Sequence, residues 1–310
     1  MSDIKLFRYG NGVAKELSGS SALVEKHLQN LIESQMSEFL GISFLASEYS
    51  TGKTHRGRID SLGIDENRCP VIVEYKRHTN ENVINQGLYY LDWLLDHQAE
   101  FKLLVMDKLG KETADKIEWQ GTRLLCIAAD FTKYDGHAVS QIRRNIELIR
   151  YKLFGKDLLL LELVNAVAVK EAVLDVVADA KPSTGKGEKS KDKTFAEQFE
   201  ASAPELLALY EQLSTFIHSL GDDVQEKELK LYTAFRRLRN FACAILYPKN
   251  DPRICLILKL EPSTVEQQDG FIRDVSKIGH WGTGDVEVIV RDAITLEKAK
   301  HLIERSYQEN

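Results

Sequence analysis

The chain has 310 residues, enough for two ordinary domains and a substantial buried core. Its residues are 43% hydrophobic and 28% charged, as in soluble globular proteins, and no apolar run approaches the roughly 18 residues of a membrane span. The formal charge of −6 argues against non-specific coating of nucleic acid, which depends on neutralising phosphates. It does not exclude a nuclease, for which a local basic groove is enough.

The four cysteines, at positions 69, 126, 243 and 255, form no CxxC pair and have no histidines spaced for a zinc site. Residues 1–12 have neither the basic start nor the apolar stretch of a signal peptide. We therefore expect reduced thiols and a cytoplasmic location.

One segment, 180–194 (AKPSTGKGEKSKDKT), has the composition of a linker. It contains a proline, two glycines and five lysines but no large apolar residue, so it cannot bury enough surface to offset the entropy of ordering. We predict a domain at 1–179 and a second at 195–310. A solvated tether is favoured over the alternative, in which these lysines touch DNA.

The pattern before the linker predicts an α/β domain with a mixed sheet flanked by helices. The expected elements are a helix at 21–40, strands at 58–64 and 70–77, a helix at 82–96 followed by a second to 109, a strand at 123–129, a helix at 137–148, and one or two strands in 157–169. The second domain is expected to be small and α+β, with a helix at 195–220, β structure at 231–247, 253–260 and 286–290, and a helix at 295–307.

Asp60 and Glu74 are the first candidates for chemistry. If the turn between the two strands is centred on Asn67, Asp60 lies directly opposite Glu74, and opposed residues point to the same face of a sheet. Lys76 leaves the strand from that face two residues later, opposite Arg58. Two acids, a lysine and an arginine would then share one patch.

A solvated sheet face is the alternative interpretation of this patch. Val71, Val73 and Tyr75 cover the opposite face, however, and the first strand ends in apolar residues, so both faces look partly buried. Charges in such a setting need partners, and a divalent metal suits two acids. The pattern alone leaves the two interpretations level.

The first helix contributes a third acid. At about 100° per residue, Glu25 falls between Ile32 and Met36 in an apolar stripe. A carboxylate there needs an interior partner, either a metal or, as the alternative, a buried Arg or Lys. Glu33 falls at the edge of the stripe and is expected to be a surface acid.

The helix at 82–96 places Gln86, Tyr90 and Trp93 opposite its core stripe, with Gln86 and Tyr90 neighbours at i, i+4. Aromatic residues there would either stack on bases or be covered by the next helix, and both interpretations stay open.

Three residues beside the patch are candidates for contacting DNA. Arg56 and Arg58 are the better ones, because a guanidinium binds phosphate through two parallel hydrogen bonds. His55 could also touch phosphate, but an ordinary surface histidine is the favoured interpretation.

These residues together resemble the PD-(D/E)XK nuclease superfamily. The matching segments are, in order, Glu25, Gly57-Arg58-Ile59-Asp60, Ile72-Val73-Glu74-Tyr75-Lys76 and Gln86-Gly-Leu-Tyr-Tyr90. The most similar branch includes the archaeal and actinobacterial NucS (EndoMS) nucleases, and the Gln-x-x-x-Tyr motif is similar to that of RecB-type nuclease domains. The resemblance covers about residues 22 to 92 and implies a restriction-endonuclease-like fold.

The resemblance also implies roles. Asp60 and Glu74 would bind Mg²⁺ or Mn²⁺ and Glu25 would complete the metal site. Lys76 would orient the attacking water or stabilise developing charge, and Gln86 with Tyr90 would brace the site or contact the strand. The implied activity is a metal-dependent deoxyribonuclease, an endonuclease rather than an exonuclease, serving repair, restriction or phage defence.

Two other functions remain as alternatives. One is an inactive nucleic-acid-binding or scaffold protein on a nuclease fold, and the other is a nuclease for RNA or branched structures. The presence of all four residues, Glu25, Asp60, Glu74 and Lys76, favours an active enzyme.

The sequence departs from the resemblance in two places. Ile59 replaces the proline that usually precedes the aspartate, and the accessory domain follows the nuclease domain, whereas NucS has a different one before it. The C-terminal part, notably residues 279–285, resembles an uncharacterised bacterial domain labelled "predicted transport protein", although no membrane segment supports transport. We expect this domain to bind a protein partner, a second subunit or a DNA feature.

Overall fold

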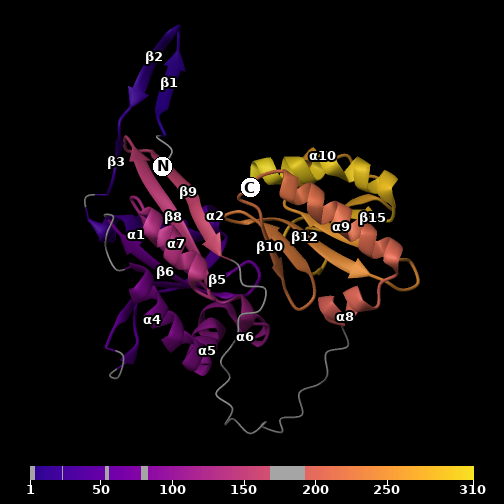
Figure 1. Ribbon diagram of the computed structural model, residues 1–310, viewed down its shortest axis with the longest axis horizontal. Helices are drawn as coiled ribbons and strands as arrows, with labels where there is room; N and C mark the ends of the chain where they lie inside the picture. Colours follow the sequence, from indigo (N-terminus) through magenta and orange to yellow (C-terminus); the bar gives the residue numbers. More distant parts are fainter. Residues whose placement is uncertain (1–3, 23, 53–55, 78–82, 168–192) are drawn as a thin grey trace. The chain divides into compact units, whose positions relative to one another are not determined.

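The computed structural model describes residues 4–22, 24–52, 56–77, 83–167 and 193–310. Contacts between Cα atoms divide the chain into two units, Met1–Val169 and Lys170–Asn310. Figure 1 shows the elements of each unit. Of the predicted linker at 180–194, residues 180–192 lie outside the described residues.

A seven-stranded mixed sheet forms the centre of the first unit. Its strand order is β3-β8-β7-β6-β5-β4, with β9 paired to β8. The β6–β7 and β7–β8 pairs are parallel and the other pairs are antiparallel. The strands are β3 (Gly19–Ser20), β4 (Ile42–Ser50), β5 (Arg58–Asp65), β6 (Pro70–Lys76), β7 (Arg123–Ala128), β8 (Asn145–Phe154) and β9 (Leu158–Val167).

Helices cover both faces of this sheet, which confirms the predicted α/β class. On one face, the hydroxyl of Ser61 in β5 donates a hydrogen bond to Glu33 of α1. On the other face, the neighbouring Leu62 packs in the core with Leu91 and Leu94 of α4. The helices are α1 (Glu25–Ser34), α2 (Met36–Leu40), α4 (Val83–Asp96), α5 (Gln98–Leu109), α6 (Lys111–Asp115) and α7 (Lys133–Gln141), with a 3-10 turn, η1 (Trp119–Gly121). The single helix expected at 21–40 is therefore two helices that meet at Gln35.

The helix expected at 137–148 is wrong over its second half. Helix α7 ends at Gln141, and Asn145 begins the parallel strand β8, in which Ile146 and Leu148 are fully buried. A strand buried on both faces carries a nearly continuous apolar run, so its periodicity does not separate it from a buried helix.

The sequence expectations also omitted an N-terminal hairpin. Strands β1 (Leu6–Gly10) and β2 (Val13–Leu17) pair antiparallel around Asn11 and Gly12. Both turn residues have positive φ, 52° and 75°, as a two-residue type I′ turn requires. Strand β4 was omitted as well.

The second unit is α+β, as predicted. Its six-stranded sheet has the order β10-β11-β12-β13-β15-β14, and every neighbouring pair is antiparallel. The buried core joins this sheet to α9 and α10. The elements are α8 (Phe195–Glu200), α9 (Pro204–Ser219), β10 (Gln225–Glu228), β11 (Thr233–Arg236), β12 (Asn240–Tyr247), β13 (Arg253–Leu258), the 3-10 turn η2 (Pro262–Thr264), β14 (Ile272–Asp274), β15 (Val286–Val290) and α10 (Ala293–Glu309).

Throughout the described residues, every helix is too short or too polar to cross a membrane.

Candidate active site

The strand hairpin has the register that the sequence predicts. Ser61 pairs with Val73, and the ladder continues in step to Ile64 and Pro70 at the turn. Backbone pairing ends at Ser61, one residue before the opposed acids would meet.

Two carboxylates take over where the backbone ladder stops. The N–H of Tyr75 donates to Asp60 Oδ2 at 3.0 Å, and the N–H of Asp60 donates to Glu74 Oε1 at 3.2 Å. Each acid thus occupies a place that a backbone carbonyl would fill in a continuous sheet. The bonds fix both side chains at the point where β5 and β6 separate.

Glu74 is the more deeply buried of the two acids. It is 0% exposed, and within the described part of the chain its Oε2 is buried without a hydrogen-bond partner. Burial, and after it the negative charge of Asp60, raises the pKa of Glu74 to about 9. Burial is also the main cause that raises the pKa of Asp60. Two acids in this setting resist ionising together.

Lys76 supplies a positive charge beside these acids. Its side chain is 13% exposed at the end of β6, and its charge opposes the increase in the pKa of both Asp60 and Glu74. Its Nζ lies 3.6 Å from Oε2 of Glu25.

Glu25 contacts Lys76 rather than joining the two acids. Its side chain is 41% exposed, because Glu25 is the first residue of α1 and lies beyond the buried stripe. Its Oε1 also accepts the N–H of Arg77 at 3.4 Å. Across the described residues, no three His, Cys, Asp or Glu side chains gather in a way that could hold a metal. The partner of Glu25 is therefore the lysine that the sequence left as an alternative, in a half-exposed position.

Tyr90 braces the approach to Asp60. Its buried ring packs against Gly57, where any larger residue would collide with it, and its Oη accepts the N–H of Arg58 at 3.3 Å. Gln86 is half-buried and its Nε2 lies 3.5 Å from the same oxygen. The two residues thus hold the start of β5 in place.

Trp93 is 2% exposed and packs against the rings of Tyr49 and His97, with centroid distances of 5.7 and 4.6 Å. Of the two interpretations left open for the aromatic side of this helix, stacking on bases is wrong for Trp93, which is covered.

A hydrogen-bond network behind the site was not predicted. Gln29, 4% exposed on α1, donates through Nε2 to the carbonyl oxygen of Asp60 at 2.6 Å and to Glu33 Oε1 at 2.9 Å. Glu33 in turn accepts from the hydroxyl of the buried Ser61 at 2.6 Å, and that hydroxyl lies 3.1 Å from the hydroxyl of Tyr75. The expectation that Glu33 is a surface acid is wrong, because its carboxylate accepts a hydrogen bond from the buried hydroxyl of Ser61 on the face of β5 that α1 covers.

The three predicted DNA contacts differ in placement. Arg58 is 69% exposed, and its Nη1 lies 3.4 Å from Oε2 of Glu48 on β4. Arg56 is exposed and has a positive φ of 51°. His55 lies outside the described residues.

Comparison with known proteins gives three kinds of match. Residues 195–310 match a family described as "Domain of unknown function (DUF5655)". An uncharacterised protein of Haemophilus influenzae is 25% identical over 308 residues, which cover 99% of this chain and the whole of that protein.

Two solved structures resemble the chain weakly. One is a repair endonuclease from Pyrococcus abyssi, with a TM-score of 0.28, 17% identity, and coverage of 42% of this chain and 48% of that one. The other is an EndoMS complex with double-stranded DNA, with a TM-score of 0.25, 19% identity, and coverage of 42% and 47%. The chain spans about half the length of each of these proteins. TM-scores this low carry no argument about function, so any proposal of function must rest on the geometry of the site.

Proposed function

We propose that the first unit hydrolyses phosphodiester bonds of DNA with Mg²⁺ or Mn²⁺ held by Asp60 and Glu74. The observation that carries this proposal is the buried Oε2 of Glu74, which has no hydrogen-bond partner among the described residues and lies beside a second carboxylate. Leaving a buried carboxyl oxygen without a partner is costly, and a divalent cation, on replacing the proton of Glu74, would satisfy it.

The donor set fits such an ion. Mg²⁺ binds through oxygen and often takes only one or two protein carboxylates, with water and substrate phosphate completing its shell. One oxygen of Asp60 and one of Glu74 are fixed by backbone N–H groups, so both side chains are oriented in advance. A cation here would also relieve the repulsion between the two acids.

When bound, the metal would supply a Lewis acid for the phosphate and a more acidic water. The chain's own residues would do the rest. The Lys76 ammonium would stabilise negative charge that develops on the phosphate. Glu25 would position Lys76 through their ion pair, and Gln86 and Tyr90 would hold the start of β5.

The substrate class follows from the four segments that resemble DNA nucleases of the PD-(D/E)XK type. We propose endonucleolytic cutting in repair, restriction or phage defence. The same chemistry on RNA, and binding without cutting, are the outcomes that the experiment must separate.

The experiment incubates the purified protein with supercoiled plasmid, linear single strands, flapped duplex and RNA, in Mg²⁺, Mn²⁺ or EDTA. We expect DNA cleavage that requires the metal and disappears in Glu74→Gln. Glu112→Gln is the matched control, because Glu112 is 84% exposed on α6 and far from the two strands in sequence. Binding without cleavage under every condition would instead make the chain a nucleic-acid-binding scaffold.

A further inference from the structure

The β1–β2 hairpin stands clear of the body of the first unit (Figure 1). All of β1 and the first four residues of β2 are exposed, and Phe7 and Tyr9 are 52% and 77% exposed. A two-stranded hairpin is at best marginally stable alone in water. Exposed aromatic residues on such an arm suit contact with another molecule.

The two faces of the hairpin differ in chemistry. Arg8 pairs with Lys15 across the strands, so two positive side chains stand directly opposite each other. Phe7 and Tyr9 alternate with Arg8 and therefore lie on the other face. Like charges in opposed positions destabilise a strand pair unless an anion lies between or beside them.

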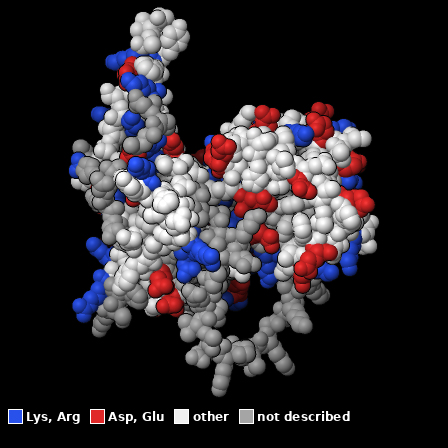
Figure 2. Space-filling view, in the orientation of Figure 1, with Lys and Arg blue, Asp and Glu red and all other residues white. Residues whose placement is uncertain are grey.

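The charge of the arm is opposite to that of the chain. Residues 5–17 contain three basic side chains and one acid, in a chain of formal charge −6. That acid, Glu16, pairs with Lys5 at 3.5 Å. Within the described residues no acid forms an ion pair with Arg8 or Lys15. Figure 2 shows basic side chains along the projecting arm.

The root of the arm is joined to the candidate active site. Strand β3 pairs with the end of β8, and Lys152 Nζ donates to the carbonyl oxygen of Ile4 at 3.3 Å. The N–H of Ala22 then donates to the hydroxyl of Tyr151 at 3.0 Å, three residues before Glu25 opens α1. Soon after the arm, the chain thus enters α1, whose first residue, Glu25, forms the ion pair with Lys76.

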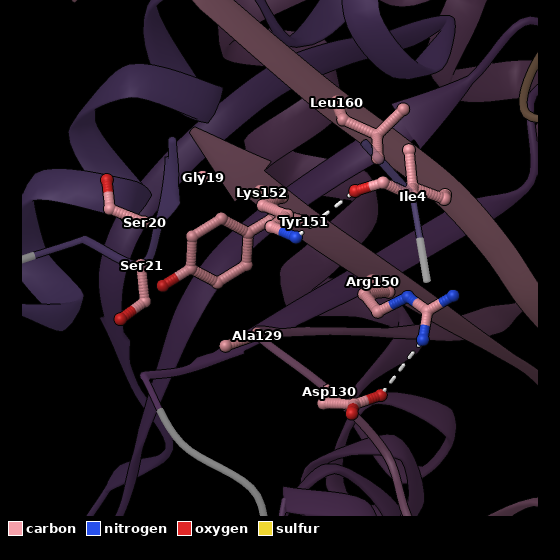
Figure 3. Close-up of a pocket in the computed structure, with 10 residues that line it drawn as sticks. All are labelled: Ile4, Gly19, Ser20, Ser21, Ala129, Asp130, Arg150, Tyr151, Lys152 and Leu160. Atoms are coloured by element: carbon pink, nitrogen blue, oxygen red, sulfur yellow. Dashed lines mark hydrogen bonds and ion pairs between the residues drawn. The ribbon is translucent and has the colours of Figure 1, made fainter. Parts of the chain in front are cut away.

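A cavity of about 390 Å³ lies at this root (Figure 3). Its lining includes Ser20, Ser21 and Lys152. Across the parallel strands, Lys76 pairs with Ala128 and Ala128 pairs with Arg150, another lining residue. Lys76 and Arg150 therefore lie in one row across three neighbouring strands, with their backbones two strand spacings or about 10 Å apart.

We infer that the β1–β2 hairpin is a DNA-binding arm that grips duplex DNA beside the point of cleavage. This inference rests on the proposed function, because it takes DNA as the substrate. Arg8 and Lys15 meet phosphates of the duplex, which supply the anion that the opposed pair lacks. A two-stranded ribbon has the width that the major groove of B-DNA admits, and strands of this length reach about 17 Å.

The test measures binding and cutting separately, with the full-length protein. Fluorescence anisotropy of a labelled short duplex in EDTA gives Kd over a range of salt concentrations. The variant Arg8→Glu/Lys15→Glu is compared with Lys108→Glu/Lys111→Glu, which makes the same charge change on the exposed side chains of α5 and α6. We expect the arm variant to lose more than tenfold in affinity and the salt slope to fall by about 2, since each phosphate contact contributes nearly one. The control should stay near wild type, and all melting temperatures should agree.

Equal affinity and salt slope in the two variants would overturn the inference, as would binding of single strands but not of duplex. A wild-type dimer in sedimentation velocity that the arm variant dissociates, with DNA affinity unchanged, would assign the arm to a second copy and also overturn it. Glu74→Gln separates the two proposals: it should lose cleavage and keep full binding. Failure of the chemistry is therefore distinguishable from failure of the arm.

Discussion

Glu74 links the site to the stability of the fold. With no metal bound, its pKa is raised from 4.5 to about 9, so between these values the folded state holds a proton that the unfolded state lacks. The stability that this proton brings is fully present below the lower value and is lost as pH rises to the upper one. Asp60, whose pKa is also raised, acts in the same direction.

The free energy of unfolding in EDTA should therefore fall between about pH 5 and about pH 9. Glu74→Gln should flatten this dependence, because its amide does not titrate. Urea denaturation across that range provides the measurement. A wild-type curve that rises with pH, or a variant as pH-dependent as wild type, would contradict the buried protonated state.

We expect Lys76 and Glu25 to behave alike, since they form an ion pair with each other and our proposal gives neither of them to the metal. Millimolar Mg²⁺ or Mn²⁺ should raise the melting temperature of wild type by mass action. Lys76→Ala and Glu25→Gln should keep that shift, and Lys76→Ala should lose cleavage by about a hundredfold or more. A Glu25→Gln protein without the metal-induced shift would make Glu25 a ligand, as the family resemblance implies.

At the scale of elements, α1 supports β5 from behind the site. Gln29→Ala would leave the carbonyl of Asp60 without its side-chain donor, and we expect a loss of about 1–3 kcal/mol in the free energy of unfolding. Gln35→Ala, at the exposed end of the same helix, is the control and should change stability little. Equal values for the two variants in denaturant titrations would show that the network is dispensable.

Several elements could be predicted because their signals are local. The register of β5 and β6 follows from a short turn at Asn67, and α4 from its strong helical periodicity. The β1–β2 hairpin was missed although Asn11-Gly12 between two short alternating segments is a strong hairpin signal. Strand β8 was not separable from a helix, because strands buried on both faces lose their alternation.

The site could be predicted only in part. Asp60 and Glu74 were placed together by pairing within one hairpin. The interactions of Gln29 and Glu33 depend on how α1 lies over the sheet, which no local pattern fixes. The sequence did contain one signal for this network. Gln29 and Glu33 form a polar pair at i, i+4 beside the apolar stripe, and Ser61 lies at an inward position of its strand.

At the scale of the whole chain, the chemistry should belong to the first unit. A chain ending at Ala180 should retain metal-dependent cleavage. It should lose affinity or selectivity for its substrate, because the truncation removes the second unit, which we expect to bind a partner or a DNA feature. Plasmid cleavage and duplex binding by the two halves provide the measurement. A folded first half that is inert, beside a second half that cuts, would reverse the assignment.

The Lys-rich segment at 180–194 should be the first site of trypsin cleavage. Brief digestion should leave two stable fragments divided near it, identified by mass spectrometry. Primary cleavage between residues 60 and 100 would show that the folded core of the first domain does not lie where we place it.

The central claim is that Asp60 and Glu74 together hold the catalytic metal. Its most direct test is Mn²⁺ binding followed by electron paramagnetic resonance, with DNA cleavage measured on the same samples of wild type and Asp60→Asn. We predict bound Mn²⁺ and cleavage for wild type, and neither for Asp60→Asn, which should be at least as stable as wild type without metal because a repelling charge is gone. An Asp60→Asn protein that binds Mn²⁺ and cuts DNA at the wild-type rate would contradict the account.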